Sequence, residues 1–176
     1  DVALQHYDLD NSLFEAMLDP TMSYSCGYWQ QADTLAQAQR NKLDLICRKL
    51  ELQPGMTLLD IGCGWGGLLE HASRHYGVRG VGITLSKEQA ALATQRCAEH
   101  DVDIRLQDYR TLQGQFDRVV SVGMFEHVGR RNYSVFMASC AQRLRPKGLM
   151  LLHTIGSNVS SHHHDQCRSN ITTPPG

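Results

Sequence analysis

The sequence predicts an α/β fold with a mostly parallel sheet, on three observations. From residue 55 onward, short apolar runs alternate with segments whose apolar residues recur at helical spacing. Glycines follow the first apolar run in LLDIGCGWGG, which is typical of a buried strand that turns sharply into a helix. Five runs are predicted as strands: 56–61, 78–83, 102–106, 116–122 and 149–155. Because strands that alternate with helices pair in parallel, we expect one sheet covered by helices.

Two helices are expected ahead of the first strand. The stretch NSLFEAML places its apolar side chains on one face of a helix that a following proline ends. A second helix, with Asp33 or Thr34 as its N-cap, runs through TLAQAQRNKLDLICRKLEL until Pro54-Gly55. The aromatic stretch YSCGYW is expected to connect these two helices.

Three further helices are expected between the strands, at 66–76, 86–100 and 131–144. Each repeats apolar residues at intervals of three and four. The RPKG stretch, residues 145–148, is expected to turn the chain into the last strand. Residues 158–176 have little apolar content and no period, so they are predicted to form a polar, disordered tail.

Composition limits what the protein can bind. A formal net charge of −1 with interspersed signs lacks a basic face, so no nucleic-acid partner is expected. Six cysteines without a CxxC pair are typical of reduced thiols in a cytosolic protein. No apolar run approaches the roughly 20 residues of a membrane helix, so the chain is not expected to be transmembrane. Three consecutive histidines, 162–164, cannot all point at one ion, so no metal site is expected.

The glycine loop after the first strand is the strongest local signal of a ligand site. Gly62, Gly64 and Gly66 let backbone approach a ligand where a Cβ atom would collide. The loop also fits the GxGxxG pattern of dinucleotide sites, which place an acid at the end of the second strand. Thr84 and Leu85 stand there instead, which disfavours a dinucleotide. A tight strand-to-helix turn without a ligand is the alternative interpretation.

Two polar residues are expected at the same edge of the sheet as the glycine loop. Glu126 follows the fourth strand, and His153 lies near the end of the fifth. Ligands of open α/β sheets bind outside the carboxyl ends of the strands, so both side chains are candidates for the site. A helix-start charge for Glu126 and a satisfied core position for His153 are the alternatives.

Seven stretches together resemble a known family: HYDL, DPTMSYSCGYW, LLDIGCGWGG, GITLSKEQ, QDYR, FDRVVSVGMFEHVG and LLHTIGS. In this order, from about residue 5 to 157, they are similar to the cyclopropane-fatty-acyl-phospholipid synthases, which are related to the mycolic acid cyclopropane synthases. Asp60, directly before the glycines, also resembles motif I of the class I S-adenosylmethionine-dependent methyltransferases. The resemblance implies their Rossmann-like three-layer fold, truncated here after the fifth strand because family members continue into further helices and strands.

The resemblance implies an enzyme that transfers a methylene group from S-adenosylmethionine to the cis double bond of a phospholipid acyl chain. A bicarbonate ion is the base in this family, and the matching positions are Cys26, Glu126, His153 and the backbone near Ile155. Cys26 is thus expected to be a hydrogen-bonding ligand of the anion and not a nucleophile. Its aromatic neighbours in YSCGYW are expected to line the cofactor and acyl pocket.

The resemblance assigns the cofactor to ten residues: Tyr24, Ser25, Asp60, Gly62, Gly64, Gly66, Thr84, Gln89, Asp108 and Tyr109. Two of these have structural alternatives, since Gln89 matches a capping box with Ser86 and Asp108 matches a turn residue. Residues 1–54 are expected to form a helical segment that covers the cofactor and active site. Residues 55–157 are expected to form the S-adenosylmethionine-binding core.

Phospholipid acyl chains are the partners that the resemblance implies, for a cytoplasmic protein in peripheral contact with the inner face of the membrane. Because the last predicted strand is apolar and has no successor, homo-oligomers through its edge are expected. Three other functions remain open. They are a non-catalytic or truncated S-adenosylmethionine-binding fragment, a methyltransferase for small molecules, and a nicotinamide oxidoreductase.

Overall fold

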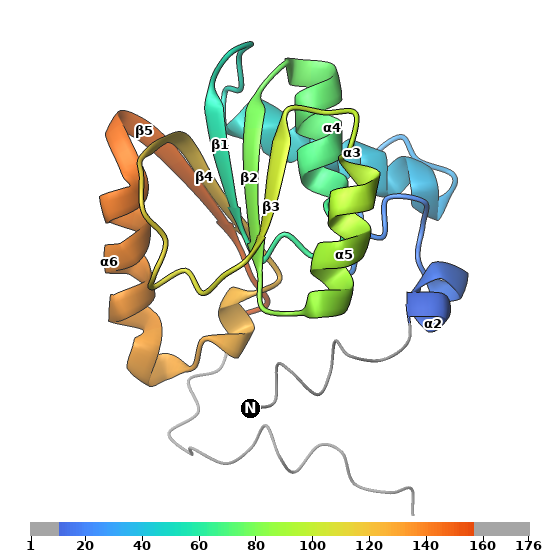
Figure 1. Cartoon of the computed structure of the whole chain (residues 1–176). Helices are drawn as coiled ribbons and strands as arrows, with labels where there is room; N and C mark the ends of the chain where they lie inside the picture. Colours follow the sequence, from blue (N-terminus) through green and yellow to red (C-terminus); the bar gives the residue numbers. More distant parts are fainter. Residues whose placement is uncertain (1–10, 157–176) are drawn as a thin grey trace, which may run out of the picture.

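The central element of the fold is a five-stranded parallel sheet. The structure is a computed structural model that describes residues 11–156. Its strands lie in the order β3-β2-β1-β4-β5, and every neighbouring pair is parallel (Figure 1). Their bounds are β1 Thr57–Ile61, β2 Arg79–Thr84, β3 Val102–Leu106, β4 Phe116–Val122 and β5 Leu144–His153. The predicted α/β class and all five predicted strands are confirmed.

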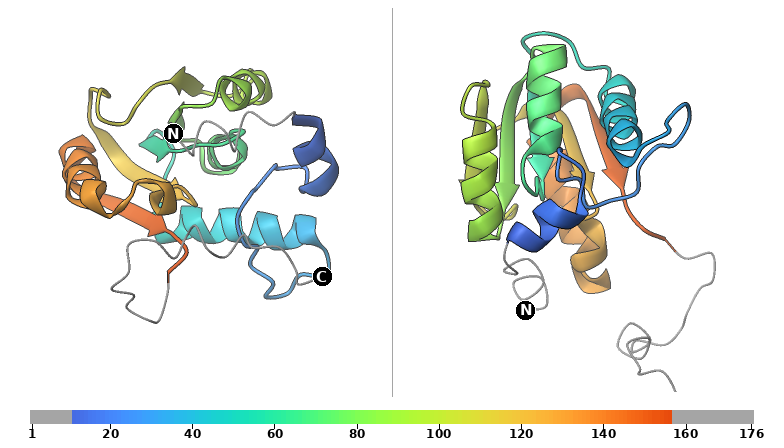
Figure 2. Two further views of the ribbon diagram at one scale, coloured as in Figure 1. Left: turned by 90° about the horizontal axis from the view of Figure 1, so that it is seen from below. Right: turned by 90° about the vertical axis from the view of Figure 1, so that its right-hand side faces the viewer.

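Helices cover both faces of the sheet, as a three-layer fold requires. One face carries α3 (Leu35–Lys49), α4 (Gly67–Tyr76) and α5 (Lys87–Arg96) (Figure 1). The other carries α6 (Tyr133–Arg143), and Figure 2 shows the same separation of α6 from α3 in the view from below. The remaining helical elements are α2 (Asn11–Met17) and two short 3₁₀ helices after β4, η1 (Phe125–His127) and η2 (Arg130–Asn132).

Two apolar clusters join these layers. Successive side chains of a strand point to opposite faces of the sheet. Leu58 of β1 therefore packs with Leu43 of α3 and Leu69 of α4, whereas Leu59 packs with Phe136 of α6. All of these side chains are at most 2 % exposed. Helix α3 thus shares a core with the sheet across the predicted boundary between residues 54 and 55.

The structure decides between the two predicted N-caps of α3 and shortens α5. Thr34, not Asp33, is the N-cap of α3, and its hydroxyl accepts a hydrogen bond from the Gln37 N–H at 3.3 Å. Helix α5 ends at Arg96, four residues earlier than predicted, and Cys97 leaves the helical conformation. The Cys97 thiol lies 3.8 Å from the carbonyl oxygen of Gly66 at the start of α4. Packing between helices therefore ends α5, which periodicity alone does not reveal.

The RPKG stretch lies within the bounds of β5 and not ahead of it as predicted. Residues 145–148 interrupt the pairing with β4 between Leu144, which pairs with Phe116, and Leu149, which pairs with Arg118, and Lys147 adopts a φ of 64°. Arg145 donates a hydrogen bond to the Asp117 carboxylate of β4 at 2.8 Å, which holds this irregularity against the sheet. β5 ends at His153, two residues before the end of the predicted strand.

The sequence predicts neither a membrane-spanning helix nor a metal site. Within residues 11–156, no helix is long and apolar enough to cross a membrane. In the same range, no three His, Cys, Asp or Glu side chains are grouped so that they could hold a metal ion. The predicted tail, residues 158–176, lies outside the described residues together with its three histidines.

Candidate active site

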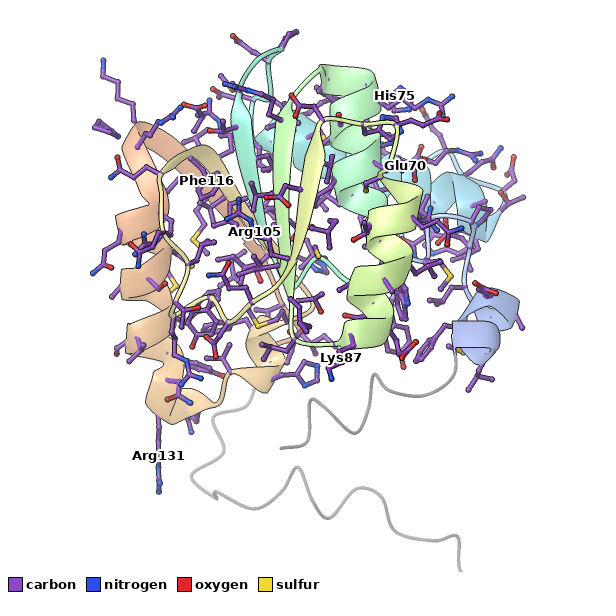
Figure 3. All side chains as sticks on the ribbon, in the orientation of Figure 1. Glu70, His75, Lys87, Arg105, Phe116 and Arg131 are labelled. Atoms are coloured by element: carbon purple, nitrogen blue, oxygen red, sulfur yellow. The ribbon has the colours of Figure 1, made fainter. Side chains whose placement is uncertain are left out.

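A cavity of about 450 Å³ opens at the carboxyl ends of the strands. Small-molecule sites have volumes of roughly 300–1,000 Å³, so this volume suits a cofactor. In Figure 3, Lys87 marks this end of the sheet, and Phe116 lies toward the opposite end. Nine of the ten predicted cofactor residues line the cavity, and Gly66 does not.

The glycine loop leaves β1 in a conformation that favours glycine. Gly62 has a φ of 83° and Gly64 a φ of 55°. A Cβ atom on Gly62 would lie 2.7 Å from Met124 Cγ, whereas a Cβ on Gly64 would have no atom within 4 Å. At Gly66 the nearest atom would be the Cys97 sulfur at 3.1 Å. Gly64 therefore leaves room toward the cavity, and Gly66 serves the packing of α4 on α5.

Asp60 places a carboxylate in the cavity wall, and one of its oxygen atoms lacks a hydrogen-bond partner among the described residues. It lies on β1 two residues after Leu58 and so faces α3, and it is only 3 % exposed. Its Oδ1 atom has no hydrogen-bond partner among the described residues. Burial raises the pKa of Asp60 to about 7, and the nearby Lys42 opposes that shift. A ligand that brings a donor to Oδ1 would complete the site.

Thr84, Ser86 and Gln89 form the wall where β2 leads into α5. The Thr84 hydroxyl donates to Gln89 Oε1 at 2.8 Å, and the Gln89 N–H donates to Ser86 Oγ at 3.3 Å. Ser86 is thus the N-cap of α5, which confirms that half of the predicted capping box. The Gln89 side chain accepts from Thr84, and the Ser86 N–H donates to Thr84 Oγ1 at 3.2 Å. Gln89 lies in the first turn and lines the cavity as well, so its structural role does not remove it from the cavity wall.

Asp108 and Tyr109 line the cavity after β3. The Asp108 carboxylate accepts a hydrogen bond from the Arg110 N–H at 2.8 Å and pairs with its guanidinium group. These hydrogen bonds to Arg110 lower the pKa of Asp108. Asp108 therefore has the predicted turn role in addition to its place in the wall. The Tyr109 ring packs edge-on against Phe136, with centroids 5.3 Å apart.

The segment Ser23–Ser25 lines the cavity and is held by α3. Gln39 donates to the Ser25 carbonyl at 2.8 Å and to the Ser23 carbonyl at 3.3 Å. Lys42 donates to Ser25 Oγ at 2.9 Å. These bonds place Tyr24 and Ser25 in the cavity wall.

Sequence reasoning missed Gln39 and Lys42. Both are polar but lie on the buried face of α3, beside the apolar Ala38 and Leu43. Polar side chains in the apolar stripe of a helix were the available signal, because such positions are rarely polar without a partner.

The aromatic residues of YSCGYW divide between two environments. Tyr24 lines the cavity, with its ring 5.6 Å from that of Phe14. Tyr28 and Trp29 are outside the cavity lining, and Trp29 is 56 % exposed, so their predicted role in the pocket is not matched by the cavity. Gly27 fits against α3, since a Cβ there would lie 2.9 Å from Ala38 Cβ.

Four predicted residues form two contacts where β5 ends. Glu126 Oε1 accepts a hydrogen bond from the Ile155 N–H at 2.8 Å. Cys26 Sγ lies 3.6 Å from His153 Nε2. Parallel pairing of Val122 with His153 brings the loops after β4 and β5 together.

This cluster has unused hydrogen-bonding capacity. Glu126 Oε2 and His153 Nδ1 are buried and have no hydrogen-bond partner among the described residues. They lie outside the cavity lining itself, but Met124 and His127 from the same loop are part of that lining. The arrangement can therefore hold a small polar ligand next to a bound cofactor.

The sequence model of mycolic acid cyclopropane synthetase matches residues 1–172. The chain belongs to the mycolic acid cyclopropane synthetase family. A relative in this family, the cyclopropane-fatty-acyl-phospholipid synthase of Escherichia coli (strain K12), is 53% identical over 175 residues. That match covers 99% of this chain and 46% of the relative. The chain thus spans about half the length of the curated relatives that it matches.

Solved structures confirm the class I methyltransferase fold of this mycolic acid cyclopropane synthetase family member. The crystal structure of mycolic acid cyclopropane synthase CmaA1 complexed with SAH and CTAB has a TM-score of 0.82 at 43% identity. It is matched over 85% of this chain and 54% of that chain. Coclaurine N-methyltransferase bound to N-methylheliamine and SAH has a TM-score of 0.76 at 27% identity, over 83% of this chain and 45% of that one.

Proposed function

We propose that this chain is the cofactor-binding part of an S-adenosylmethionine-dependent cyclopropane synthase. The substrate would be the cis double bond of a phospholipid acyl chain. The observation that carries the proposal is the pair of contacts Cys26–His153 and Glu126–Ile155, which form where β5 ends, next to a loop that lines the cavity. Family membership and the name of the Escherichia coli relative support the same reaction.

S-adenosylmethionine fits the cavity in two respects. Its α-amino group can donate to Asp60 Oδ1, which has no partner among the described residues. Its body can pass over Gly64, where no atom lies within 4 Å of the Cβ position. When bound, the cofactor supplies an electrophilic methyl group. SAH in the CmaA1 complex supports this choice of cofactor.

Bicarbonate is the base in this proposal. Glu126 Oε2 and His153 Nδ1 are free to exchange hydrogen bonds with a small oxyanion. The Ile155 N–H donates to Glu126 Oε1, so an anion that used this donor would compete with Glu126 for it. Two like charges side by side are unfavourable, so Glu126 and the anion would share a proton, and His153 can hold the compensating charge.

The site also needs to exclude water, because a carbocation formed from the alkene reacts with any nucleophile. Tyr109, Met124 and Val128 line the cavity and supply apolar surface. Tyr109 is one of the predicted cofactor residues, and Met124 and Val128 each lie two residues from Glu126 in the chain. This lining supports deprotonation by a held base in preference to capture by solvent.

We propose further that a cytoplasmic protein meets the inner face of the membrane with this end of the sheet. Exposed apolar side chains occur here, with Leu85 at 52% and Ile155 at 82% exposure. Such side chains favour contact with acyl chains over contact with water. Flotation of the protein with phospholipid vesicles measures this contact directly, and no flotation would contradict it.

Self-association through β5 is also part of the proposal. In the order β3-β2-β1-β4-β5, the outer edge of β5 has no neighbouring strand among the described residues. Such an edge can pair with another chain. Light scattering should therefore detect association of the 176-residue chain. A version extended to the length of the relatives should associate less, and a stable monomer of the short chain would contradict the proposal.

Binding of S-adenosylhomocysteine tests the cofactor assignment. At 100 times its dissociation constant, a ligand that binds only the folded state adds about 2.7 kcal/mol to the free energy of unfolding. We expect a corresponding rise in melting temperature, and no rise with NADH. The absence of any shift with S-adenosylhomocysteine would exclude the assignment.

Gly64→Val is the matched variant for this test. The branched side chain would occupy the open space over Gly64, so S-adenosylhomocysteine should no longer raise the melting temperature. A variant that keeps the full shift would place the ligand elsewhere.

The substrate is tested in a version extended to the length of the relatives. Mass spectrometry of lipids from expressing cells should reveal acyl chains heavier by one methylene group. Methylation of small amines without lipid products would favour the alternative that coclaurine N-methyltransferase represents. Cofactor binding without any product would favour a non-catalytic fragment.

A further inference from the structure

Lys42 is a lysine in an unusual place. It lies on the buried face of α3, is only 7 % exposed, and lines the cavity. Burial lowers its pKa to about 8, although Asp19, Cys26 and Asp60 oppose that shift. A buried ammonium group costs free energy unless charges and hydrogen bonds compensate it. The groups that compensate Lys42 therefore indicate what it does.

The carboxylates of Asp19 and Asp60 both act on the Lys42 ammonium group, but they differ in the other hydrogen bonds that they accept. Asp19 accepts hydrogen bonds from the Thr21 hydroxyl at 2.7 Å and from the Ser23 N–H at 3.1 Å. It is therefore occupied with the segment that leads to the cavity. Asp60 is 3 % exposed, and its Oδ1 has no partner among the described residues. The two charges available to a ligand in this wall are thus the Lys42 ammonium and the Asp60 carboxylate.

We propose that Lys42 is a positioning residue that makes the cavity select a cofactor with an α-amino-acid end. Its ammonium group orients the Ser25 hydroxyl at the cavity wall and balances the charge of Asp60. The ligand's ammonium group then pairs with Asp60, and its carboxylate lies on the side of Ser25 and Lys42. This inference rests on the proposed function, because S-adenosylmethionine and its demethylated product both carry such an end.

A purely structural role for Lys42 would have a different signature. Gln39 already ties the Ser23–Ser25 segment to α3 through the backbone carbonyls of its first and last residues. Lys42 adds only a bond to a side-chain hydroxyl. Loss of a structural tie would weaken every ligand of the cavity equally. Loss of charge recognition would weaken only ligands that carry the amino-acid end.

Calorimetric titration with two probes separates these roles. The probes are S-adenosylhomocysteine and 5′-methylthioadenosine, which lacks the amino-acid end. In Lys42→Met, we expect the dissociation constant for the first probe to rise at least about tenfold, as for loss of a charged hydrogen bond. For the second probe it should rise less than about threefold. Lys49→Met, an exposed position on the same helix, is the matched control and should change neither.

A double-mutant cycle tests whether Lys42 acts on the ligand by orienting the Ser25 hydroxyl. Ser25→Ala should weaken S-adenosylhomocysteine binding in the wild-type chain and have little further effect in Lys42→Met. Lys42→Gln keeps a hydrogen-bond donor without charge and serves if Lys42→Met does not fold. It should again weaken the first probe more than the second.

Each other outcome overturns a defined claim. Equal weakening of both probes, additive effects of the Ser25 and Lys42 changes, or unchanged binding in both Lys42 variants would overturn the role of Lys42 while the cofactor assignment stands. A wild-type chain that binds 5′-methylthioadenosine but not S-adenosylhomocysteine would overturn the role of Lys42 and the choice of cofactor together.

Discussion

The two ends of the sheet treat polar side chains in opposite ways. At the amino end, Asp117 of β4 accepts hydrogen bonds from the Thr57 N–H, the Thr57 hydroxyl and Arg145, each at 2.8 Å. At the carboxyl end, Asp60 Oδ1, Glu126 Oε2 and His153 Nδ1 are buried without a hydrogen-bond partner among the described residues.

This difference separates groups that stabilise the fold from groups that prepare a site. A polar group with protein partners contributes to the free energy of unfolding. A buried group without them costs free energy until a ligand supplies the partner. Substitutions at the two ends should therefore affect different measurements.

Glu126→Gln should have the largest effect, and on turnover. In an enzyme extended to the length of the relatives, we expect the rate to fall about 100-fold or more, as for loss of a group that takes part in proton transfer. The free energy of unfolding should not decrease, because the Gln Oε1 atom can still accept from the Ile155 N–H and Glu126 Oε2 has no partner to lose. Lipid turnover and chemical denaturation are the two measurements.

His153→Ala is the companion variant and should also reduce turnover more than cofactor affinity. Both groups are assigned to the base and not to the cofactor. If cofactor affinity falls in proportion to the rate in either variant, this division of roles is wrong.

Asp117→Ala should have the next largest effect, and on stability. It leaves the Thr57 N–H and Arg145 without their shared acceptor, so the free energy of unfolding should fall by about 2 kcal/mol. S-adenosylhomocysteine affinity should stay the same. Asp103→Ala, which breaks an exposed ion pair with Arg105, is the control and should cost less than about 1 kcal/mol. A change in affinity without a loss of stability would contradict the comparison.

Protonation of Asp117 at low pH should cause a smaller loss of stability than its replacement by alanine. The hydrogen bond from the Thr57 N–H, followed by Arg145, lowers the pKa of Asp117 to about 2. Its ordinary value is about 3.9, so its stabilising contribution is present above about pH 4 and is lost as the pH falls toward 2. Asp117→Asn should lose less stability than the wild type over this range. Denaturation curves of both proteins at each pH test the sign, and parallel pH profiles would refute it.

Cys26→Ser should have the smallest effect. The contact between Cys26 Sγ and His153 Nε2 is 3.6 Å, and a hydroxyl can replace a thiol in a hydrogen bond. We expect turnover of the extended enzyme to fall by less than about tenfold. Complete inactivation with intact cofactor binding would instead indicate a nucleophile.

The parts of the fold that the sequence predicts well are those with local causes. The glycine loop follows from the conformation that Gly62 and Gly64 must adopt. The placement of Glu126 and His153 follows from the rule that ligands bind at the carboxyl ends of the strands. In each case, a short stretch of sequence contains the physical reason.

The parts that the sequence missed depend on partners far along the chain. The irregularity at residues 145–148 of β5 is held by Asp117, and Cys97, where α5 ends early, packs against Gly66 at the start of α4. Lys42 and Gln39 lie in the apolar stripe of α3, which is a local signal of burial, but that signal does not identify their partners. Asp60 and the Ser23–Ser25 backbone become their neighbours only when α3 packs on the sheet, which is why both residues were absent from the predicted site.

The contact between Cys26 and His153 joins positions 127 residues apart. The residues that line the cavity run from Thr21 to Asn132, so all of them precede His153 in the chain. During synthesis, a ribosome would therefore release the whole cavity lining before it releases His153 and Ile155. The residues proposed to hold the base would be completed last, so the order of translation also sets the order in which the two parts of the proposed site can assemble.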